Sequence, residues 1–340
     1  MQVRNSYPIK NLNAFRVDVE TEEFYAIDKI DQLLFLIKEK KVFEHTPLVL
    51  GGGYNCLFTK NYSGCLLYNC LLGITKMVEN EKGVRVKVAS GEKWQNFVDW
   101  SVKQGLGGVE NLTNIPGTVG AAPIQNIGAY GSEVCNSIVE VEGVDLSSGE
   151  CLSLSNAECQ FSYRHSIFKE KYKDKIFITS VTFELQKNPI VNIQYKDILD
   201  VIEKNKLSKE DLSIEFIKKT IANIRAAKLP DPDVIPNAGS FFKNPIVSSH
   251  RMRSIRELYP HVSVYDLKNG QYKLSAAWLI DTCGLKGFNH KGAGVHENHA
   301  LVLVNHSNAD GKTIVELSQI IQKNVEQKFG LKLEPEVNFI

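Results

Sequence analysis

Residues 115–131 read Ile115-Pro116-Gly117-Thr118-Val119-Gly120-Ala121-Ala122-Pro123-Ile124-Gln125-Asn126-Ile127-Gly128-Ala129-Tyr130-Gly131, and this stretch decides the fold. Four glycines, three alanines and two prolines make it unsuited to a long helix, while its apolar residues make it unsuited to a solvated linker. Small residues let the backbone pack closely against a flat group or another backbone. The stretch therefore predicts either a buried crossover between sheets or a cradle whose main-chain groups hold a diphosphate and a flat ring system.

A second glycine-rich segment, Gly51-Gly52-Gly53-Tyr54-Asn55, directly follows residues 47–50, which are typical of a short buried strand. Its three glycines let backbone amides approach an anion such as a diphosphate. The segment matches neither the Gly-x-Gly-x-x-Gly fingerprint nor a Walker A loop. Taken alone, it is equally consistent with a tight turn.

Around these two segments, short strands and helices alternate without a long series of strand–helix–strand units. Apolar side chains at helical spacing predict helices near residues 28–37, 94–105, 214–228, 276–283 and 314–330. Alternation and apolar runs predict strands at residues 83–89, between 138 and 185, at 300–304 and at 331–340. The pattern predicts an α+β fold with a boundary near residues 211–233, and it argues against a doubly wound Rossmann domain.

The composition excludes several broad classes of protein. With 43% hydrophobic and 23% charged residues, the chain is long enough for two or three domains with sizeable cores. A net charge of +1 favours neither nucleic acid nor a membrane surface as a partner, and no run approaches the roughly 18 apolar residues of a membrane span. Seven scattered cysteines argue against a disulfide framework, and the first residues lack the apolar core of a signal peptide. We therefore expect a cytoplasmic protein that binds a small molecule, and a monomer, since no heptad seam is visible.

Three further segments contain candidate catalytic residues. Arg164 lies in the aromatic run at 161–166, where its guanidinium can polarise a carboxylate or carbonyl, unless it is a surface arginine. Ser240 lies between Gly239 and two phenylalanines, where it can donate a proton, unless it only caps a turn. Glu336 lies on the face of the last predicted strand opposite Val337, so it points either into a cleft or into water.

The segment His296-Glu297-Asn298-His299 does not predict a metal site. Its two histidines lack the i,i+4 spacing of the His-Glu-x-x-His helix, and a predicted strand follows.

Taken together, five segments in this order resemble the UDP-N-acetylenolpyruvoylglucosamine reductase family (the MurB family) nearly end to end. They are the Gly-Gly-Gly-x-Asn loop at 51–55, the run at 115–131, Tyr-Arg-x-Ser at 163–166, Asn-Ala-Gly-Ser-Phe-Phe-Lys-Asn-Pro at 237–245 and Glu-Pro-Glu-Val at 334–337.

The resemblance implies an FAD-binding fold of the vanillyl-alcohol-oxidase (PCMH) type, with two α+β subdomains, together with an α+β substrate-binding domain. The implied ranges are 1–70 and 71–212 for the two FAD-binding subdomains, 213–330 for the substrate-binding domain, and 331–340 for a strand that returns Glu336 to the active site. The residues implied to bind FAD are Gly51, Gly52, Gly53, Tyr54, Asn55, Ile115, Pro116, Gly117, Gly120, Ala121, Ile127 and Gly128.

The resemblance also implies a reaction. NADPH reduces FAD, which then passes hydride to the enolpyruvyl ether of UDP-N-acetylglucosamine enolpyruvate, giving UDP-N-acetylmuramate for peptidoglycan synthesis. Arg164 and Glu336 match the pair that stabilises the enolate, and Ser240 matches the proton donor. The residues implied to bind substrate are Tyr130, Tyr195, Lys228, Asn244, Lys286 and His299, of which Tyr195 marks the longer type of the family.

Four positions depart from the family pattern. Tyr54 and His299 replace residues that usually contact ligand, while Ala14 and Asn338 replace a common threonine and arginine. Two alternatives stay open: another FAD-dependent oxidoreductase of the same fold, and a non-catalytic protein that binds nucleotide sugars.

Overall fold

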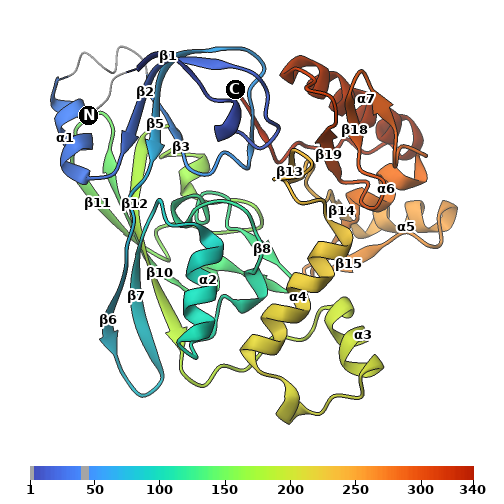
Figure 1. Ribbon diagram of the computed structural model, residues 1–340. Helices are drawn as coiled ribbons and strands as arrows, with labels where there is room; N and C mark the ends of the chain where they lie inside the picture. The colour runs from blue at the N-terminus through green and yellow to red at the C-terminus, as the bar shows by residue number, and fades with distance from the viewer. Residues whose placement is uncertain (1–3, 40–45) are drawn as a thin grey trace. The chain divides into compact units, whose positions relative to one another are not determined.

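The computed structural model describes residues 4–39 and 46–340, and these form two compact units (Figure 1). Among the described residues, the first unit contains 4–7, 21–39, 46–52 and 63–227. The second contains 8–20, 53–62 and 228–340. Each unit mixes helices with mainly antiparallel strands, which confirms the predicted α+β class.

Two sheets form the framework of the first unit. The four-stranded sheet has the order β1-β2-β5-β3, with β1 at Arg4–Pro8, β2 at Glu20–Ile27, β5 at Tyr62–Asn69 and β3 at Leu48–Leu50. The five-stranded sheet has the order β11-β10-β12-β7-β6, with β11 at Cys151–Ser155, β10 at Ile138–Asp145, β12 at Ile176–Gln186, β7 at Gly83–Ala89 and β6 at Ile74–Glu79. A short hairpin pairs β8 (Gly128–Ala129) with β9 (Ser132–Glu133).

Four α-helices belong to the first unit, and the sequence periodicity predicted all of them except the helix at 196–204. They are α1 (Ile30–Glu39), α2 (Trp94–Lys103), α3 (Lys196–Lys204) and α4 (Ile214–Lys228), the last ending at the boundary of the unit. Helix α2 buries Trp94 and Phe97, and the Phe97 ring lies 4.6 Å from the Phe183 ring of β12. Burial of this aromatic cluster fixes α2 on the five-stranded sheet, directly before the run at 115–131.

The second unit is built on smaller sheets. A four-stranded sheet has the order β13-β19-β18-β17, with β13 at Asn237–Ser240, β19 at Val302–Asn305, β18 at Ala293–Val295 and β17 at Asn289–His290. A three-stranded sheet has the order β14-β16-β15, with β14 at Ile246–Ser248, β16 at Gln271–Leu274 and β15 at Val264–Asp266. Strand β4 (Cys56–Leu57) pairs in parallel with β20 (Asn338–Phe339), which ties residues near position 56 to the end of the chain.

Three α-helices complete the second unit: α5 (Ser249–Leu258), α6 (Ala276–Thr282) and α7 (Gly311–Phe329). The side chain of Asp310 caps α7 by accepting a 2.8 Å hydrogen bond from the amide of Thr313. Gly330 ends the helix in the left-handed conformation, at φ 59°, as its position after the apolar stripe predicts.

Short 3₁₀ helices link these elements. They are η1 (Lys10–Leu12), η2 (Glu110–Leu112), η3 (Val119–Ala121), η4 (Val134–Asn136), η5 (Ile167–Lys169) and η6 (Lys209–Asp211).

Two sequence predictions about strands are corrected by the structure. The strand predicted at 300–304 begins two residues later, as Val302–Asn305. The final ten residues form no continuous strand: only Asn338–Phe339 pair regularly, with one isolated bridge at Pro335. Pro335 fits this bridge because the two hydrogen bonds, from the amides of Lys243 and Glu336, are made by residues on either side of it and need no amide from the proline. Within this segment Phe339 is 45% exposed, whereas Val337 is 4% exposed.

Candidate functional site

Within the first unit, Gly51 of the glycine loop lies against the run at 115–131. A Cβ placed on Gly51 would lie 2.6 Å from Oγ1 of Thr118 and 3.7 Å from Cβ of Ala121. Gly51 therefore has no room for a side chain. Two segments separated by more than sixty residues thus converge, as expected if both line one cofactor site.

The run at 115–131 is fixed by backbone hydrogen bonds to the end of β7. The amide of Gly120 donates to Ser90 O over 2.8 Å, and the amide of Val119 donates to Glu92 O over 2.9 Å. A Cβ on Gly117 would meet no atom within 4 Å, and Gly117 has a φ of +126°, which suits glycine. One side of this anchored backbone is therefore open, which fits a cradle for a flat cofactor better than a fully packed crossover.

Arg164 lies in a tight turn of the first unit. Ser162 and His165 exchange backbone hydrogen bonds of 3.0 and 3.1 Å, and Arg164 between them has a φ of +54°. Its Nη2 donates a 2.7 Å hydrogen bond to Gly128 O, and its Nη1 lies 3.5 Å from Asn126 O. The guanidinium thus lies directly against the run at 115–131.

Tyr130 and Tyr195 also meet in the first unit. Their rings make an edge-to-face contact with centroids 4.9 Å apart, although 64 positions separate them in sequence. Tyr195 precedes the first residue of α3, and Asn111 donates a 3.0 Å hydrogen bond to Tyr130 O. Burial raises the pKa of the Tyr130 phenol, an effect that the nearby Arg225 guanidinium opposes.

In the second unit, Ser240 is the last residue of β13. It pairs across the ladder with Val302 of β19 and is exposed, although the next two residues, Phe241 and Phe242, are 0% and 1% exposed. Burial of these rings pins the strand, while Gly239 before the serine faces open space. The hydroxyl of Ser240 is therefore exposed, while the two buried phenylalanine rings that follow it hold its backbone in place.

Glu336 lies beside this strand. Its amide donates a 2.8 Å hydrogen bond to Phe241 O, and its carbonyl accepts a 3.3 Å hydrogen bond from Nδ2 of Asn55. Asn338 returns two bonds of 3.0 Å, from its amide and its Nδ2, to Asn55 O. The second unit thus brings together three predicted site segments, which contain Asn55, Ser240 and Glu336.

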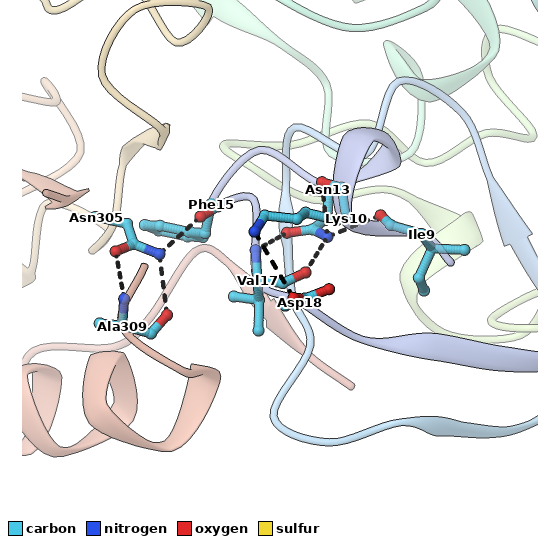
Figure 2. Close-up of polar contacts among 8 residues, drawn as sticks. All are labelled: Ile9, Lys10, Asn13, Phe15, Val17, Asp18, Asn305 and Ala309. Atoms are coloured by element: carbon cyan, nitrogen blue, oxygen red, sulfur yellow. Dashed lines mark hydrogen bonds and ion pairs between the residues drawn. The ribbon is translucent and has the colours of Figure 1, made fainter. Parts of the chain in front are cut away.

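The loop at 9–18 is held by side-chain hydrogen bonds of Asn13 and Asn305 (Figure 2). The side chain of Asn13 closes the loop on Ile9 O and Val17 O, and Asn305 at the end of β19 donates a 2.9 Å hydrogen bond to Phe15 O. The Phe15 ring then packs edge-on against Phe241, 6.1 Å between centroids. Ala14, one of the departures from the family pattern, donates its amide to Gly53 O over 3.1 Å, so this backbone link does not need a threonine.

The remaining predicted substrate residues belong to the second unit but vary in their surroundings. Oδ1 of Asn244 accepts a 2.9 Å hydrogen bond from the amide of Ala276, at the start of α6. Lys286 forms an exposed ion pair of 3.3 Å with Asp281. His299 is half-buried, and its Nδ1 accepts from the amide of Leu301 over 3.4 Å. Lys228 is exposed at the end of α4.

Asn126 was not among the site residues predicted from the sequence, although it lies in the run at 115–131. Its side chain is 0% exposed and binds Glu133, Ser162 O and the Cys135 amide. The sequence signal was an asparagine in a glycine-rich run, a residue type that adopts left-handed backbone more readily than most. Indeed, Asn126 has a φ of +47°.

The described residues, 4–39 and 46–340, contain neither a candidate membrane-spanning helix nor a candidate metal-binding cluster. No helix there is long and apolar enough to cross a membrane. No group of three or more His, Cys, Asp or Glu side chains in these ranges could hold a metal ion.

Comparison with known families assigns both parts of the chain. Residues 24–155 match the FAD binding domain family, and residues 231–340 match the C-terminal domain of UDP-N-acetylenolpyruvoylglucosamine reductase.

Full-length relatives agree with these matches. The UDP-N-acetylenolpyruvoylglucosamine reductase of Flavobacterium johnsoniae is 39% identical over 341 residues and covers 100% of both chains. That of Photorhabdus laumondii is 43% identical over 332 residues, covering 98% of this chain and 95% of the relative. Among solved structures, the reductase from Thermus caldophilus superposes with a TM-score of 0.68 at 22% identity, over 100% of this chain and 99% of that one.

These findings confirm the fold and the cofactor predicted from the sequence. The chain has the α+β FAD-binding fold with an additional C-terminal α+β domain, and FAD is its cofactor. The open space beside the backbone of Gly117 fits this assignment, because it leaves room for a ligand held by main-chain groups.

Proposed function

Because the chain belongs to the UDP-N-acetylenolpyruvoylglucosamine reductase family, we propose that it reduces the enolpyruvyl ether of UDP-N-acetylglucosamine enolpyruvate, with NADPH as the electron donor. The product is UDP-N-acetylmuramate, a precursor of peptidoglycan. FAD, when bound, supplies the chemistry of hydride transfer from NADPH to the methylene carbon of the enolpyruvyl group.

The observation that carries the proposal is that the backbone of Glu336 is bonded to the residue that directly follows Ser240. Ser240 and Glu336 are 96 positions apart, yet the Glu336 amide bonds to the carbonyl of Phe241, the residue next to Ser240. A protein that only bound nucleotide sugars would not need a hydroxyl and a carboxyl group on adjacent backbone segments.

Ser240 is assigned as the proton donor to the carbon next to the reduced methylene. A serine hydroxyl is a weak acid, so it acts only from a preorganised position. The buried rings of Phe241 and Phe242 provide that position, because they fix the end of β13 while the hydroxyl stays exposed.

Arg164 and Glu336 are assigned to stabilise the enolate that develops on the substrate carboxylate. A guanidinium suits a growing negative charge, and it stabilises that charge best when it does not reorganise during the reaction. Two contacts to the carbonyls of Asn126 and Gly128 restrain the Arg164 guanidinium in this way. Glu336 contributes a proton that it carries or shares.

The substrate is held by residues outside this catalytic set. Lys228 and Lys286 supply positive charge for the uridine diphosphate without making the chain basic, and Asn244 contacts the same group. Tyr130 and Tyr195 form an aromatic wall, supported by the edge-to-face contact between their rings.

The residues that hold FAD are assigned to the glycine loop at 51–55 and to the run at 115–128. Support comes from the anchoring of Val119 and Gly120 to the end of β7, and from the open side of Gly117. Tyr54 replaces the usual serine, so we assign the contact of this position to backbone groups.

The cytoplasm is the expected location and a monomer the expected state. Scattered cysteines, six of them with thiol pKa values raised mainly by burial and none paired in a disulfide among the described residues, suit a reducing compartment. Size-exclusion chromatography with light scattering tests the monomer directly, and a dimer mass would contradict it.

One assay tests the proposed function. Purified protein loaded with FAD should oxidise NADPH under anaerobic conditions only when UDP-N-acetylglucosamine enolpyruvate is present. A yellow protein that oxidises NADPH with oxygen but never with this substrate would favour a different FAD-dependent oxidoreductase.

A further inference from the structure

The turn that contains Arg164 is bonded at both ends to residues 124–126. Nδ2 of Asn126 donates a 3.1 Å hydrogen bond to Ser162 O, at the start of the turn. Oγ of Ser166, just after the turn, donates a 2.6 Å hydrogen bond to Ile124 O, and Ser166 is 0% exposed. The turn therefore has a fixed place on the run at 115–131.

The tip of the arginine returns to the same segment. Its Nη2 donates to Gly128 O over 2.7 Å, and its Nη1 lies 3.5 Å from Asn126 O. A Cβ on Gly128 would lie 3.0 Å from this Nη1 and 3.1 Å from Cγ of Glu133, so the guanidinium passes directly over Gly128. Asn126 thus contacts Arg164 through its own carbonyl and through the start of the turn.

The Asn126 side chain is itself held in one orientation. Its amide nitrogen donates to Glu133 Oε2 over 2.9 Å as well as to Ser162 O, while its Oδ1 accepts from the Cys135 amide over 3.1 Å. Two donors and one acceptor are engaged, and the residue is fully buried. A buried, satisfied network of this kind resists rotation, since any other rotamer leaves polar atoms unpaired.

We propose that Asn126 is a positioning residue, which holds the Arg164 guanidinium in register with the FAD cradle through Ser162 and through its own carbonyl oxygen. The proposal rests on the enolate-stabilising role proposed above for Arg164. A misplacement of about 1 Å in such a group can cost on the order of 100-fold in rate. Asn126 acts before the substrate arrives, because every contact it makes is internal to the first unit.

Two variants separate the side chain from the backbone. Asn126→Gly keeps the left-handed backbone, at φ +47°, and the carbonyl near Arg164, but removes all three side-chain hydrogen bonds. Asn126→Asp keeps the shape and the acceptor for Cys135, but it cannot donate to Ser162 O and it places a second carboxylate beside Glu133.

Asn156→Ala is the matched control. Asn156 donates two 2.8 Å hydrogen bonds, to Cys135 O and Ile138 O, and so anchors the same region. Its two bonds go to neither the Arg164 turn nor the run at 115–131. A general loosening of the fold would therefore appear in the control as well as in the Asn126 variants.

The test measures the two half-reactions of the FAD-loaded enzyme separately by anaerobic stopped-flow absorbance. Both Asn126 variants should slow flavin reoxidation by the enolpyruvyl substrate about 10- to 100-fold, while flavin reduction by NADPH changes less than about threefold. The control should be close to the parent protein in both. The Nε signal of Arg164 in ¹⁵N NMR, without substrate, should shift or broaden in both Asn126 variants and not in the control.

Equal slowing in Asn156→Ala, or unchanged reoxidation and an unchanged Arg164 signal in both Asn126 variants, overturns the proposal. If Asn126→Gly does not retain FAD, Asn126→Asp decides the outcome. If the parent protein is itself not reoxidised by the substrate, the proposed function fails instead, and the NMR comparison still tests the positioning of Arg164.

Discussion

The backbone amide of Glu336 donates a 2.8 Å hydrogen bond to the carbonyl oxygen of Phe241. Phe241 directly follows Ser240, so the separation of Ser240 from Glu336 is set by main-chain bonds and not by the packing of either side chain. Strand β20 reinforces this link, because its pairing with β4 holds the last residues of the chain. A substitution at either side chain should therefore leave the other in place, and each proposed role can be tested alone.

Replacing Ser240 by alanine should stop reduction of the substrate but leave reduction of the flavin by NADPH nearly unchanged. We expect NADPH to bleach the FAD of Ser240→Ala at nearly the parent rate, while steady-state turnover falls about 100- to 10,000-fold, the range for loss of a general acid. Ser249→Ala is the control, since this exposed serine of the same unit only bonds to Gly270 O. Normal turnover in Ser240→Ala would show that another group donates the proton.

Replacing Glu336 by glutamine should slow flavin reoxidation by the substrate about 100-fold or more, because the carboxyl group that carries or shares a proton is lost. Glu334→Gln is its matched control, two residues earlier on the same segment. Glu334 is exposed and pairs with Lys243 over 3.1 Å, an interaction that contributes little to stability at a surface. Equal losses in both variants would point to a disturbed segment, and no loss in Glu336→Gln would remove Glu336 from the mechanism.

Gly53→Ala should disrupt the loop at 51–55. A Cβ at this position would lie 1.9 Å from Leu12 O, and Gly53 has a φ of +69°. Gly105 has a similar φ of +72° but no atom within 4 Å of its added Cβ, so Gly105→Ala isolates the strain from the clash. Chemical denaturation should show a loss of about 1 to 2 kcal/mol for Gly105→Ala from backbone strain, and a distinctly larger loss, with weaker FAD retention, for Gly53→Ala. Similar losses in the two variants would contradict the packing described for Leu12.

The cap of α7 predicts a pH dependence of stability. The Asp310 carboxylate is hydrogen-bonded to the side chain of Thr313 and accepts a second hydrogen bond from the Thr313 amide. The side-chain bond, and then the backbone bond, lower the pKa of Asp310. A folded-state pKa below the unfolded value gives stability that is present above the unfolded pKa and is lost as pH falls through the folded pKa. Asp310→Ala should therefore reduce the free energy of unfolding by about 1 kcal/mol at pH 7 and pH 5, and this difference from the parent should shrink below about pH 4.

Asp310→Asn serves as the control for that experiment. Asparagine caps a helix about as well as aspartate but does not titrate, so its stability should match the parent at neutral pH. On acidification, the free energy of unfolding of the parent should approach that of Asp310→Ala. The free energy of unfolding of Asp310→Asn should stay above that of Asp310→Ala by about the same amount at every pH. Urea denaturation across this pH range measures these differences. If the parent and Asp310→Asn lose the same amount of stability relative to Asp310→Ala on acidification, the assignment is contradicted.

Local sequence patterns predicted α1, α2, α4, α6 and α7 and a few of the strands, but not α3, α5 or most strands of the second unit. The stripe of α4 and the alternation of β7 are present where they were expected, at Ile214–Lys228 and Gly83–Ala89. The final segment was less predictable, because alternation at Leu331, Leu333 and Val337 describes burial and not pairing. All three are buried, yet only Asn338–Phe339 form a regular strand in this segment, and Phe339 is 45% exposed.

The candidate site was only partly accessible from sequence. Its segments were predicted one by one, and the family resemblance supplied their roles. The contacts that join them are long-range: Asn55 to Glu336, Tyr130 to Tyr195 and Arg164 to Gly128. Asn126 escaped notice for the same reason, since its partners at 133, 135 and 162 are adjacent only in the folded chain.

The most direct test of the central claim is anaerobic oxidation of NADPH by the FAD-loaded protein, followed with and without UDP-N-acetylglucosamine enolpyruvate. One NADPH should be consumed for each UDP-N-acetylmuramate formed, with no sustained oxidation in the absence of the substrate. FAD that is reduced by NADPH yet is never reoxidised by the enolpyruvyl substrate would contradict that claim.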